Sequence, residues 1–351
     1  MLDRAVAEDD GRALLSIVVE RLADVFEPRL TEVYERLFRQ VIERITPDLV
    51  PRLQHGRSHK FPVSAERVYV LSRITLGADV AVASVLLDAA KRRYPSAEII
   101  FVGPRKNYEL FQADPRIQHR DVTYARGGSL ADRLHASALL WFDDGVVIDP
   151  DSRLTQLGLI SVCDPARYAF FNSRSYGGES DGRLPDLAAQ WAADPMAHPF
   201  IAPRPAAGPA PDITVSLGVG ENPTKRLTDD FEGELLQMLA ATGASVLIDK
   251  GGSAEERERV ERVIQPGVRT HEGAFAPFAA EIARSKLFVG YDSAAGHVAS
   301  ACGVPLISIA KGFVGQRMAA RWRPNGTVID GNASDVLDQV RRALTTCTFR
   351  R

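Results

Sequence analysis

With 351 residues, of which 45% are hydrophobic and 25% charged, the chain has the composition of a globular protein and the length of about two domains. The formal net charge of −2 excludes a general basic field, so we expect no nucleic-acid partner. Cys163, Cys302 and Cys347 are widely spaced and form no CxxC motif, which argues against a disulfide framework or a zinc site and fits a reducing cytoplasm.

The first predicted elements are helices, because apolar side chains recur at three- and four-residue spacing across residues 12–53. Pro28 and Pro47 divide this run, and we expect residues 1–60 to form a helical N-terminal extension. Its polar positions mix acids and arginines. This mixture favours packing on the protein body, or against a second copy in a homodimer, over packing on a membrane surface.

Neither a membrane span nor a metal site is expected. No run approaches the ~18 apolar residues of a spanning helix, and no basic-then-apolar leader opens the chain, so we expect a cytoplasmic protein. His55 and His59 lie four residues apart but lack a third ligand nearby, and we interpret them as part of a solvated linker.

From residue 66 the pattern changes to alternating strands and helices, which is typical of a parallel sheet with helices on its faces. We expect this block to form a domain over residues 61–200, with a Pro- and Ala-rich linker over residues 194–212. Its expected strands span residues 66–74, 97–104, 137–142 and 145–150, and its expected helices span residues 79–95 and 107–114.

A second alternating block predicts a domain over residues 201–335 and a C-terminal helix within residues 336–351. Its expected strands span residues 212–220, 244–252, 286–290 and 306–310, and its expected helices span residues 229–243, 253–265, 277–285 and 292–305. The fold class is therefore α/β, with two Rossmann-like doubly wound domains facing a cleft. Ligands bind such sheets at the carboxyl ends of the strands.

The segment GVGENPTKR ends a strand with Gly218 and Gly220 and carries Lys225 a few residues later. Glycines let backbone amides approach an anion, and a lysine neutralises phosphate. The segment matches neither the dinucleotide motif GxGxxG nor the P-loop motif GxxxxGK[ST]. A diphosphate-binding loop and an ordinary turn with a solvated lysine both remain open.

The segment KGGSAEERE turns the chain at a glycine pair and starts a helix at Ser253. Glu256 falls in the first helical turn, where the helix dipole favours an acid. Capping explains this residue adequately, and contact with a ribose is the alternative.

The segment GYDSAAGHVASACGVP places Asp292 and Ser293 at the start of a helix, which we expect one of them to cap. Ala294 and the small residues before His297 let a ligand come close to the helix amides, which attract anions. A lone histidine is more often a core residue than a catalyst, and nothing here activates Ser293 as a nucleophile. We expect a diphosphate and sugar to lie against this backbone, with His297 bracing the turn.

Two features of the first block are candidates for acceptor chemistry. Asp79 begins a helix after the first strand and is either an ordinary N-terminal cap or a general base. The loops over residues 148–158 and 170–178 are rich in donors and acceptors, as a sugar pocket requires, although loops are polar in any case. The candidate sugar-contacting residues are Arg153, Thr155, Gln156, Asn172 and Arg174.

In their order and spacing, these segments resemble glycosyltransferase family 9, the bacterial heptosyltransferases of lipopolysaccharide core synthesis. The resemblance covers roughly residues 66–345 and leaves the helical N-terminal block unexplained. It implies a GT-B fold, in which the first domain binds the acceptor and the second binds a nucleotide sugar. The matching segments are RITLGADVAVASVLLDAAKRRYPSAEIIFVG, GVGENPTKR, KGGSAEERE and DSAAGHVASACGVP.

The resemblance also implies roles for individual residues. Asp79 matches the base that deprotonates the acceptor, and Lys225 matches the lysine on the donor phosphates. Asp292, Ser293 and the following amides match the donor-binding turn, which stabilises the departing diphosphate. The implied reaction inverts the anomeric carbon and needs no metal and no cofactor, since the nucleotide sugar is a cosubstrate.

The chain departs from the family's pattern in three places. Ala78 separates Gly77 from Asp79, where the family has an adjacent Gly-Asp pair. Ala294 replaces a glycine, and Lys311 followed by glycine stands near the donor site where the family often has Gly-Pro-Thr. These departures affect the position of the base and the identity of the donor.

We therefore expect an enzyme that transfers a heptose-like sugar from ADP or GDP to a small-molecule or natural-product acceptor. The composition, rich in alanine and arginine, favours such an acceptor over the lipopolysaccharide core, which is the first alternative. The second alternative is a non-catalytic GT-B-like protein that acts in binding or assembly.

Overall fold

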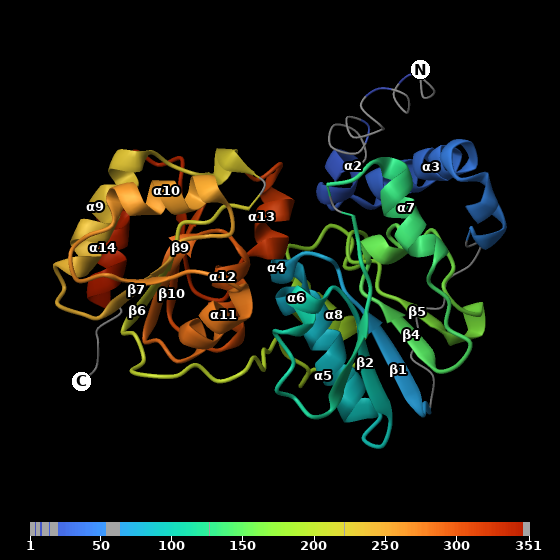
Figure 1. The fold of residues 1–351 in the computed structure, drawn as a ribbon. Coiled ribbons are helices and arrows are strands. Elements are labelled where there is room, and N and C mark those ends of the chain that lie inside the picture. The colour runs from blue at the N-terminus through green and yellow to red at the C-terminus, as the bar shows by residue number, and fades with distance from the viewer. Residues whose placement is uncertain are drawn as a thin grey trace. The chain divides into compact units, whose positions relative to one another are not determined.

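The computed structural model describes residues 20–53, 64–125, 127–220 and 222–346, together with residues 4, 8 and 14. His55, His59 and Cys347 lie outside the described residues. The chain divides into two compact units, each with its own parallel sheet (Figure 1). Unit 1 comprises Met1–Tyr108, Asp114–Pro199 and Val314–Trp322, and unit 2 comprises Glu109–Ala113, Phe200–Phe313 and Arg323–Arg351.

The sheet of unit 1 has five parallel strands in the order β3–β2–β1–β4–β5. Val68 to Leu71 of the central strand are buried on both faces, as expected when helices and loops cover both sides of a parallel sheet. The strand order reverses between β1 and β4, which puts the switch point of this sheet at their carboxyl ends. The strands are β1 Arg67–Leu71, β2 Glu98–Gly103, β3 Ile117–Asp121, β4 Val146–Asp149 and β5 Tyr168–Phe170.

The helices of unit 1 include the predicted N-terminal block. Pro28 lies in the first turn of α3, and the apolar face of α3, with Tyr34 and Phe38, shares a buried core with Leu134 of α7. The helix after β1 contains a π-helical turn at Asp79–Ala83. No helix in the described ranges is long and apolar enough to cross a membrane. The helices are α2 Glu20–Asp24, α3 Pro28–Ile45, α4 Leu76–Ala78, α5 Ser84–Arg93, α6 Arg105–Tyr108, α7 Leu130–Ala138, α8 Leu184–Trp191 and α13 Gln316–Trp322, with 3-10 turns η3 Pro47–Arg52, η5 Arg153–Thr155 and η6 Pro165–Arg167.

The sheet of unit 2 has six parallel strands in the order β11–β10–β9–β6–β7–β8. Its core includes Val215, Leu235, Val289 and Ile307, all fully buried. The order reverses between β6 and β9, so the switch point lies at the carboxyl ends of those strands. The strands are β6 Ile213–Ser216, β7 Val246–Asp249, β8 Arg269–His271, β9 Leu287–Tyr291, β10 Leu306–Ala310 and β11 Thr327–Asp330. The helical elements are η7 Pro223–Lys225, α9 Asp229–Ala240, α10 Ala254–Val263, α11 Phe275–Ala283, α12 Ala294–Ala301 and α14 Val336–Thr346.

The predicted α/β class with two doubly wound sheets is confirmed, but two predicted elements are wrong. Residues 137–142 do not form a strand, because the Ser129–Asp132 capping box starts α7 and the helix continues to Ala138. Residues 107–114 do not form a helix beyond Tyr108. The backbone of Leu110 and Ala113 instead exchanges hydrogen bonds with Ala202, at 2.7 and 2.8 Å.

The helix α13 was not predicted. The sequence interpretation placed residues 314–322 within the second block, whereas they group with unit 1. Arg321 explains the attachment, since it is fully buried and donates to the carbonyl oxygens of Tyr176 at 3.1 Å and Gly178 at 3.0 Å.

Candidate functional site

Lys225 and Asp292, two of the predicted donor-binding residues, form an ion pair in unit 2. Lys225 ends the turn η7, whose start is fixed by Asn222, which accepts the Thr224 amide at 3.1 Å. The Lys225 ammonium donates to the Asp292 carboxylate and, at 3.3 Å, to its carbonyl oxygen. Because η7 follows β6 and Asp292 follows β9, the pair lies at the switch point of the sheet, where ligands bind in this fold.

The start of α12 lies beside this ion pair. Ser293 occupies the N-cap position with an extended backbone, but neither it nor Asp292 makes a side-chain capping bond, so the predicted cap is wrong. The Asp292 carboxylate instead accepts a hydrogen bond from Lys225. The Ser293 hydroxyl is buried and has no hydrogen-bond partner among the described residues. The first amides of a helix, from Ala294 here, also lack intrahelical partners, so this turn offers hydrogen bonds to a ligand.

His297 lies one helical turn after Ser293, and its amide donates to the Ser293 carbonyl at 3.5 Å. Burial lowers the pKa of the His297 imidazole, and the nearby Asp292 carboxylate partly opposes that shift. The histidine is therefore neutral at pH 7. This fits a bracing role better than a role as a cationic phosphate ligand.

Glu256 is the N3 residue of a capping box with Ser253 at the start of α10. Its amide donates to the Ser253 hydroxyl at 3.1 Å, and its carboxylate accepts the amides of Gly252 at 3.0 Å and Ser253 at 3.3 Å. The capping interpretation is confirmed, while contact with a ribose stays a prediction. A Cβ atom at Gly218 would lie 3.5 Å from the other Glu256 oxygen, and Gly220 has a φ of 61° that glycine tolerates.

The loop after β10 approaches the lysine turn closely. Lys311 precedes Gly312, which has a φ of 75°. A Cβ atom at Gly312 would lie 2.7 Å from the Thr224 hydroxyl and 3.4 Å from Cγ of Lys225. The Lys225 ammonium also lies 5.6 Å from the centre of the Phe313 ring. Residues 311–313 therefore form one wall of the lysine site, where the sequence departs from the family's pattern.

In unit 1, Asp79 is fully buried at the carboxyl end of β1. It accepts hydrogen bonds from the Ser72 hydroxyl, the Arg73 amide and the Asn107 side-chain amide, each at 2.6 Å. Burial raises the pKa of Asp79 to about 6, against the opposing effect of these donors. Ile74, in the same loop, has a φ of 75°, a strained value for a β-branched residue. Asp79 is thus an ionisable group, enclosed by a strained loop.

The predicted sugar-contacting residues lie on the loops after β4 and β5, but three of them are buried and bonded to the protein. Thr155 donates to Asp149, Gln156 donates to the Tyr34 hydroxyl at 2.9 Å, and Arg174 pairs with Asp151. Arg153 and Asn172 are only partly buried. Of the five predicted side chains, Arg153 and Asn172 are therefore the two that remain partly accessible to a sugar.

Sequence reasoning missed Arg73, which organises this end of unit 1. Arg73 is buried, donates to the Ser173 hydroxyl at 2.8 Å and to the Pro150 carbonyl, and lies 4.0 Å from the Asp151 carboxylate. It thereby joins the loops that follow β1, β4 and β5. The only available sequence signal was its position directly after the first predicted strand.

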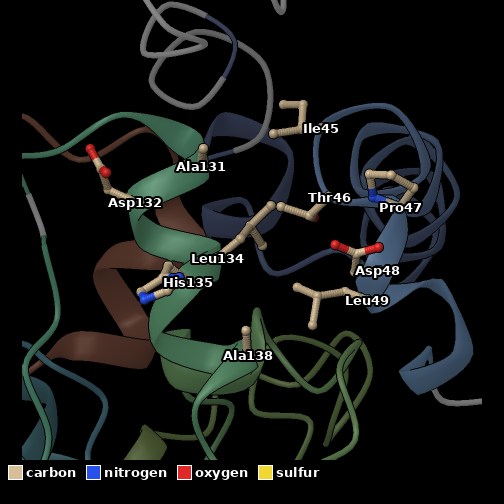
Figure 2. Close-up of a pocket in the computed structure, with 10 residues that line it drawn as sticks. All are labelled: Ile45, Thr46, Pro47, Asp48, Leu49, Ala131, Asp132, Leu134, His135 and Ala138. Atoms are coloured by element: carbon tan, nitrogen blue, oxygen red, sulfur yellow. The ribbon is translucent and has the colours of Figure 1, made fainter.

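The remaining described structure contains a pocket but no further candidate site. A pocket of about 360 Å³ opens in unit 1 between α7 and the segment that joins α3 to η3 (Figure 2). Its lining residues include Leu134 and His135 of α7, Thr46 between α3 and η3, and Asp48 of η3. None of the predicted site residues lines it. Within the described ranges, no three His, Cys, Asp or Glu side chains gather in a way that could hold a metal ion.

Comparison with known proteins gives a family match over part of the chain and a fold. Residues 180–329 match the model of glycosyltransferase family 9 (heptosyltransferase). The structure of E. coli heptosyltransferase WaaC with ADP aligns over 80% of this chain and 100% of its own, with a TM-score of 0.60 and 16% identity. A family 9 glycosyltransferase from Veillonella parvula aligns over 82% of this chain and 98% of its own, with a TM-score of 0.58 and 16% identity.

A third structure, E. coli ADP-heptose lps heptosyltransferase II, aligns over 80% of this chain and 98% of its own, with a TM-score of 0.54 and 18% identity. At these identities the likeness shows the fold, which is that of the GT-B heptosyltransferases. No curated protein sequence matches the chain.

Proposed function

We propose that this chain, whose residues 180–329 match the model of glycosyltransferase family 9, transfers a heptose-like sugar from a nucleoside diphosphate to a small-molecule acceptor. The proposed transfer inverts the anomeric carbon and needs no metal. The observation that carries this proposal is the Lys225–Asp292 pair beside the start of α12, at the switch point of the unit 2 sheet.

In the proposed donor complex, Lys225 exchanges its bond to Asp292 for the diphosphate. Asn222 fixes the start of the turn that carries Lys225, and Asp292 binds its ammonium, so the lysine is positioned before the phosphate arrives. The Ser293 hydroxyl and the first amides of α12 supply further donors to the phosphate or sugar oxygens. When the bond between anomeric carbon and diphosphate breaks, the electron pair stays on the diphosphate, and these groups stabilise the added charge.

The proposed base is Asp79. As the acceptor oxygen bonds to the anomeric carbon, on the face opposite to the departing diphosphate, its proton passes to the Asp79 carboxylate. A pKa of about 6 keeps this group ionised at pH 7 and still a competent proton acceptor. Because Asp79 is fully buried, direct transfer requires the loop with Ser72, Arg73 and Ile74 to move when the acceptor binds.

The proposed donor base is adenine or guanine, and ADP is favoured because the similar E. coli enzyme WaaC forms a complex with ADP. The exposed positions of α3 help to decide between a small-molecule acceptor and the lipopolysaccharide core. They include Glu32, Arg36, Glu43 and Arg44, which mix both charge signs. Such a surface lacks the uniformly basic face that anionic membranes attract, which supports a small-molecule acceptor over the lipopolysaccharide core.

Calorimetric titration with ADP, GDP and UDP tests the proposal. We expect one of them to bind the unaltered protein, and Lys225→Ala to raise its Kd on the order of tenfold to a hundredfold through loss of charge-assisted hydrogen bonds. Absence of binding by all three would favour the non-catalytic assembly protein. Equal affinity of the unaltered protein and K225A would remove the assigned role of the lysine.

A further inference from the structure

Glu232 of α9 is a buried acid in unit 2 that no sequence motif singles out. Its side chain has no exposed surface. One carboxylate oxygen accepts the Nε of Arg226 at 2.8 Å and the hydroxyl of Tyr291 at 3.0 Å. The other accepts a second Arg226 nitrogen at 3.3 Å and lies 3.6 Å from Nε of Arg259. The carboxylate is held in this position, because a buried charge cannot exchange these partners for water.

Two of these partners adjoin the lysine–aspartate pair in the sequence. Arg226 follows Lys225 directly, and Tyr291, the last residue of β9, directly precedes Asp292. The Tyr291 hydroxyl also accepts the amide of Leu227 at 3.2 Å. The Glu232 side chain therefore connects the lysine loop to the end of β9, next to both members of the ion pair.

The third partner reaches the remaining donor segment. Arg259 of α10 is buried and donates to the carbonyl oxygen of Leu217 at 2.7 Å. Leu217 directly precedes Gly218, the first glycine of the predicted phosphate loop. One carboxylate thus links the three chain segments that carry Gly218, Lys225 and Asp292.

We propose that Glu232 is a positioning residue for the donor: it fixes these three segments in register and so determines how tightly the nucleoside diphosphate binds. Glu232 makes no contact with the ligand itself and acts through the position of Lys225. The inference rests on the proposed function, because it takes Lys225 to be the ligand of the diphosphate.

The test compares E232Q and Y291F with D212N as a matched control. Asp212 accepts the Ser245 amide at 2.9 Å and lies 2.8 Å from the Lys286 ammonium, at the amino ends of the same sheet's strands. Calorimetry uses whichever of ADP, GDP and UDP binds the unaltered protein most tightly. We expect E232Q to raise Kd about tenfold and Y291F about threefold, with D212N unchanged although it also loses stability.

A cycle with K225A separates positioning from general destabilisation. If Glu232 acts through the lysine, E232Q raises Kd in the unaltered background but adds nothing in the K225A background. Y291F keeps the buried ring and carries the same cycle if E232Q does not fold.

Three outcomes overturn the proposal: an unchanged Kd for both variants, an equal effect in both backgrounds, or an equal effect of D212N. If the unaltered protein binds none of the three nucleotides, the proposed function fails as well. Binding by the unaltered protein with no effect of E232Q or Y291F overturns the positioning role alone.

Discussion

Asp79 and Asp149 of unit 1 are fully buried carboxyl groups, and burial raises the pKa of each to about 6 from an ordinary value of 3.8. At a pH between these two pKa values, the carboxyl group holds its proton in the folded protein and has lost it in the unfolded chain. Stability therefore falls as pH rises through this window and levels off above about pH 6. Each group contributes about 3 kcal/mol to the total change at these shifts.

Asp149→Asn tests this linkage, because an amide cannot ionise. We expect the unaltered protein to lose more unfolding free energy than D149N between pH 4 and pH 6.5, by about 3 kcal/mol. Urea denaturation, followed by tryptophan fluorescence at a series of pH values, measures the two slopes. Parallel slopes would show that the folded-state pKa of Asp149 is not raised.

Asp79→Asn tests the proposed base. We expect turnover to fall by roughly a hundredfold to ten-thousandfold, since general base catalysis contributes this much, while donor affinity stays unchanged. In the unaltered enzyme kcat/KM should rise with pH to a plateau above about pH 6, as the carboxyl ionises. Unchanged turnover in D79N would show that another group accepts the proton, and lost nucleotide affinity would point to a folding defect.

At the scale of elements, the loop after β10 and the turn η7 meet at Gly312. Gly312→Ala places a methyl group 2.7 Å from the Thr224 hydroxyl on a backbone with a φ of 75°. We expect a stability loss of about 1–2 kcal/mol and a raised nucleotide Kd, because η7 must shift and Lys225 moves with it. Urea denaturation and calorimetry measure the two effects.

Gly303→Ala is the matched control for this substitution. Gly303 follows α12 with a similar φ of 66°, but its Cβ would meet no described atom within 4 Å. Both variants therefore strain the backbone at a positive φ, but only G312A displaces η7. A raised Kd in both variants would mean that affinity follows stability rather than the position of η7.

The strand–helix alternation predicted both sheets because parallel sheets bury both faces and need long apolar runs. Residues 137–142 are equally apolar, but the Ser129–Asp132 capping box, a longer-range feature of the same segment, makes their start helical. The segment after Tyr108 was mispredicted because a tertiary bond to Ala202 competes with the helix. Local patterns therefore identified elements where no distant partner intervened.

The candidate site was also predictable only in part. Strand ends indicated Lys225 and Asp292, since the carboxyl ends of parallel strands meet at one edge of the sheet. Glu232 could not be recognised, because it stands in the run DDFEGE, where acids are typical of a helix N-terminus. Its importance depends on Arg259 and Tyr291, which are distant in sequence and contact it only in the fold.

At the scale of the whole molecule, the two units have separate cores, so unfolding need not be a single transition. Trp141, Trp191 and Trp322 all belong to unit 1. Tryptophan fluorescence therefore reports unit 1 alone, whereas far-ultraviolet circular dichroism reports both units. The unfolding of unit 2 should therefore appear in circular dichroism but not in fluorescence. A nucleoside diphosphate that binds unit 2 should raise the urea concentration at the midpoint of that transition.

Arg321→Ala tests whether α13 stabilises the unit to which it is assigned. Arg321 is buried and donates to two carbonyl oxygens in the loop after β5, so its removal leaves both without their partner. We expect the fluorescence transition to lose about 3 kcal/mol, while the nucleotide-sensitive dichroism transition stays unchanged. Arg323→Ala, at an exposed position two residues later, should alter neither. If R321A instead shifts the nucleotide-sensitive transition, α13 stabilises unit 2, and the division of the chain at residue 314 is wrong.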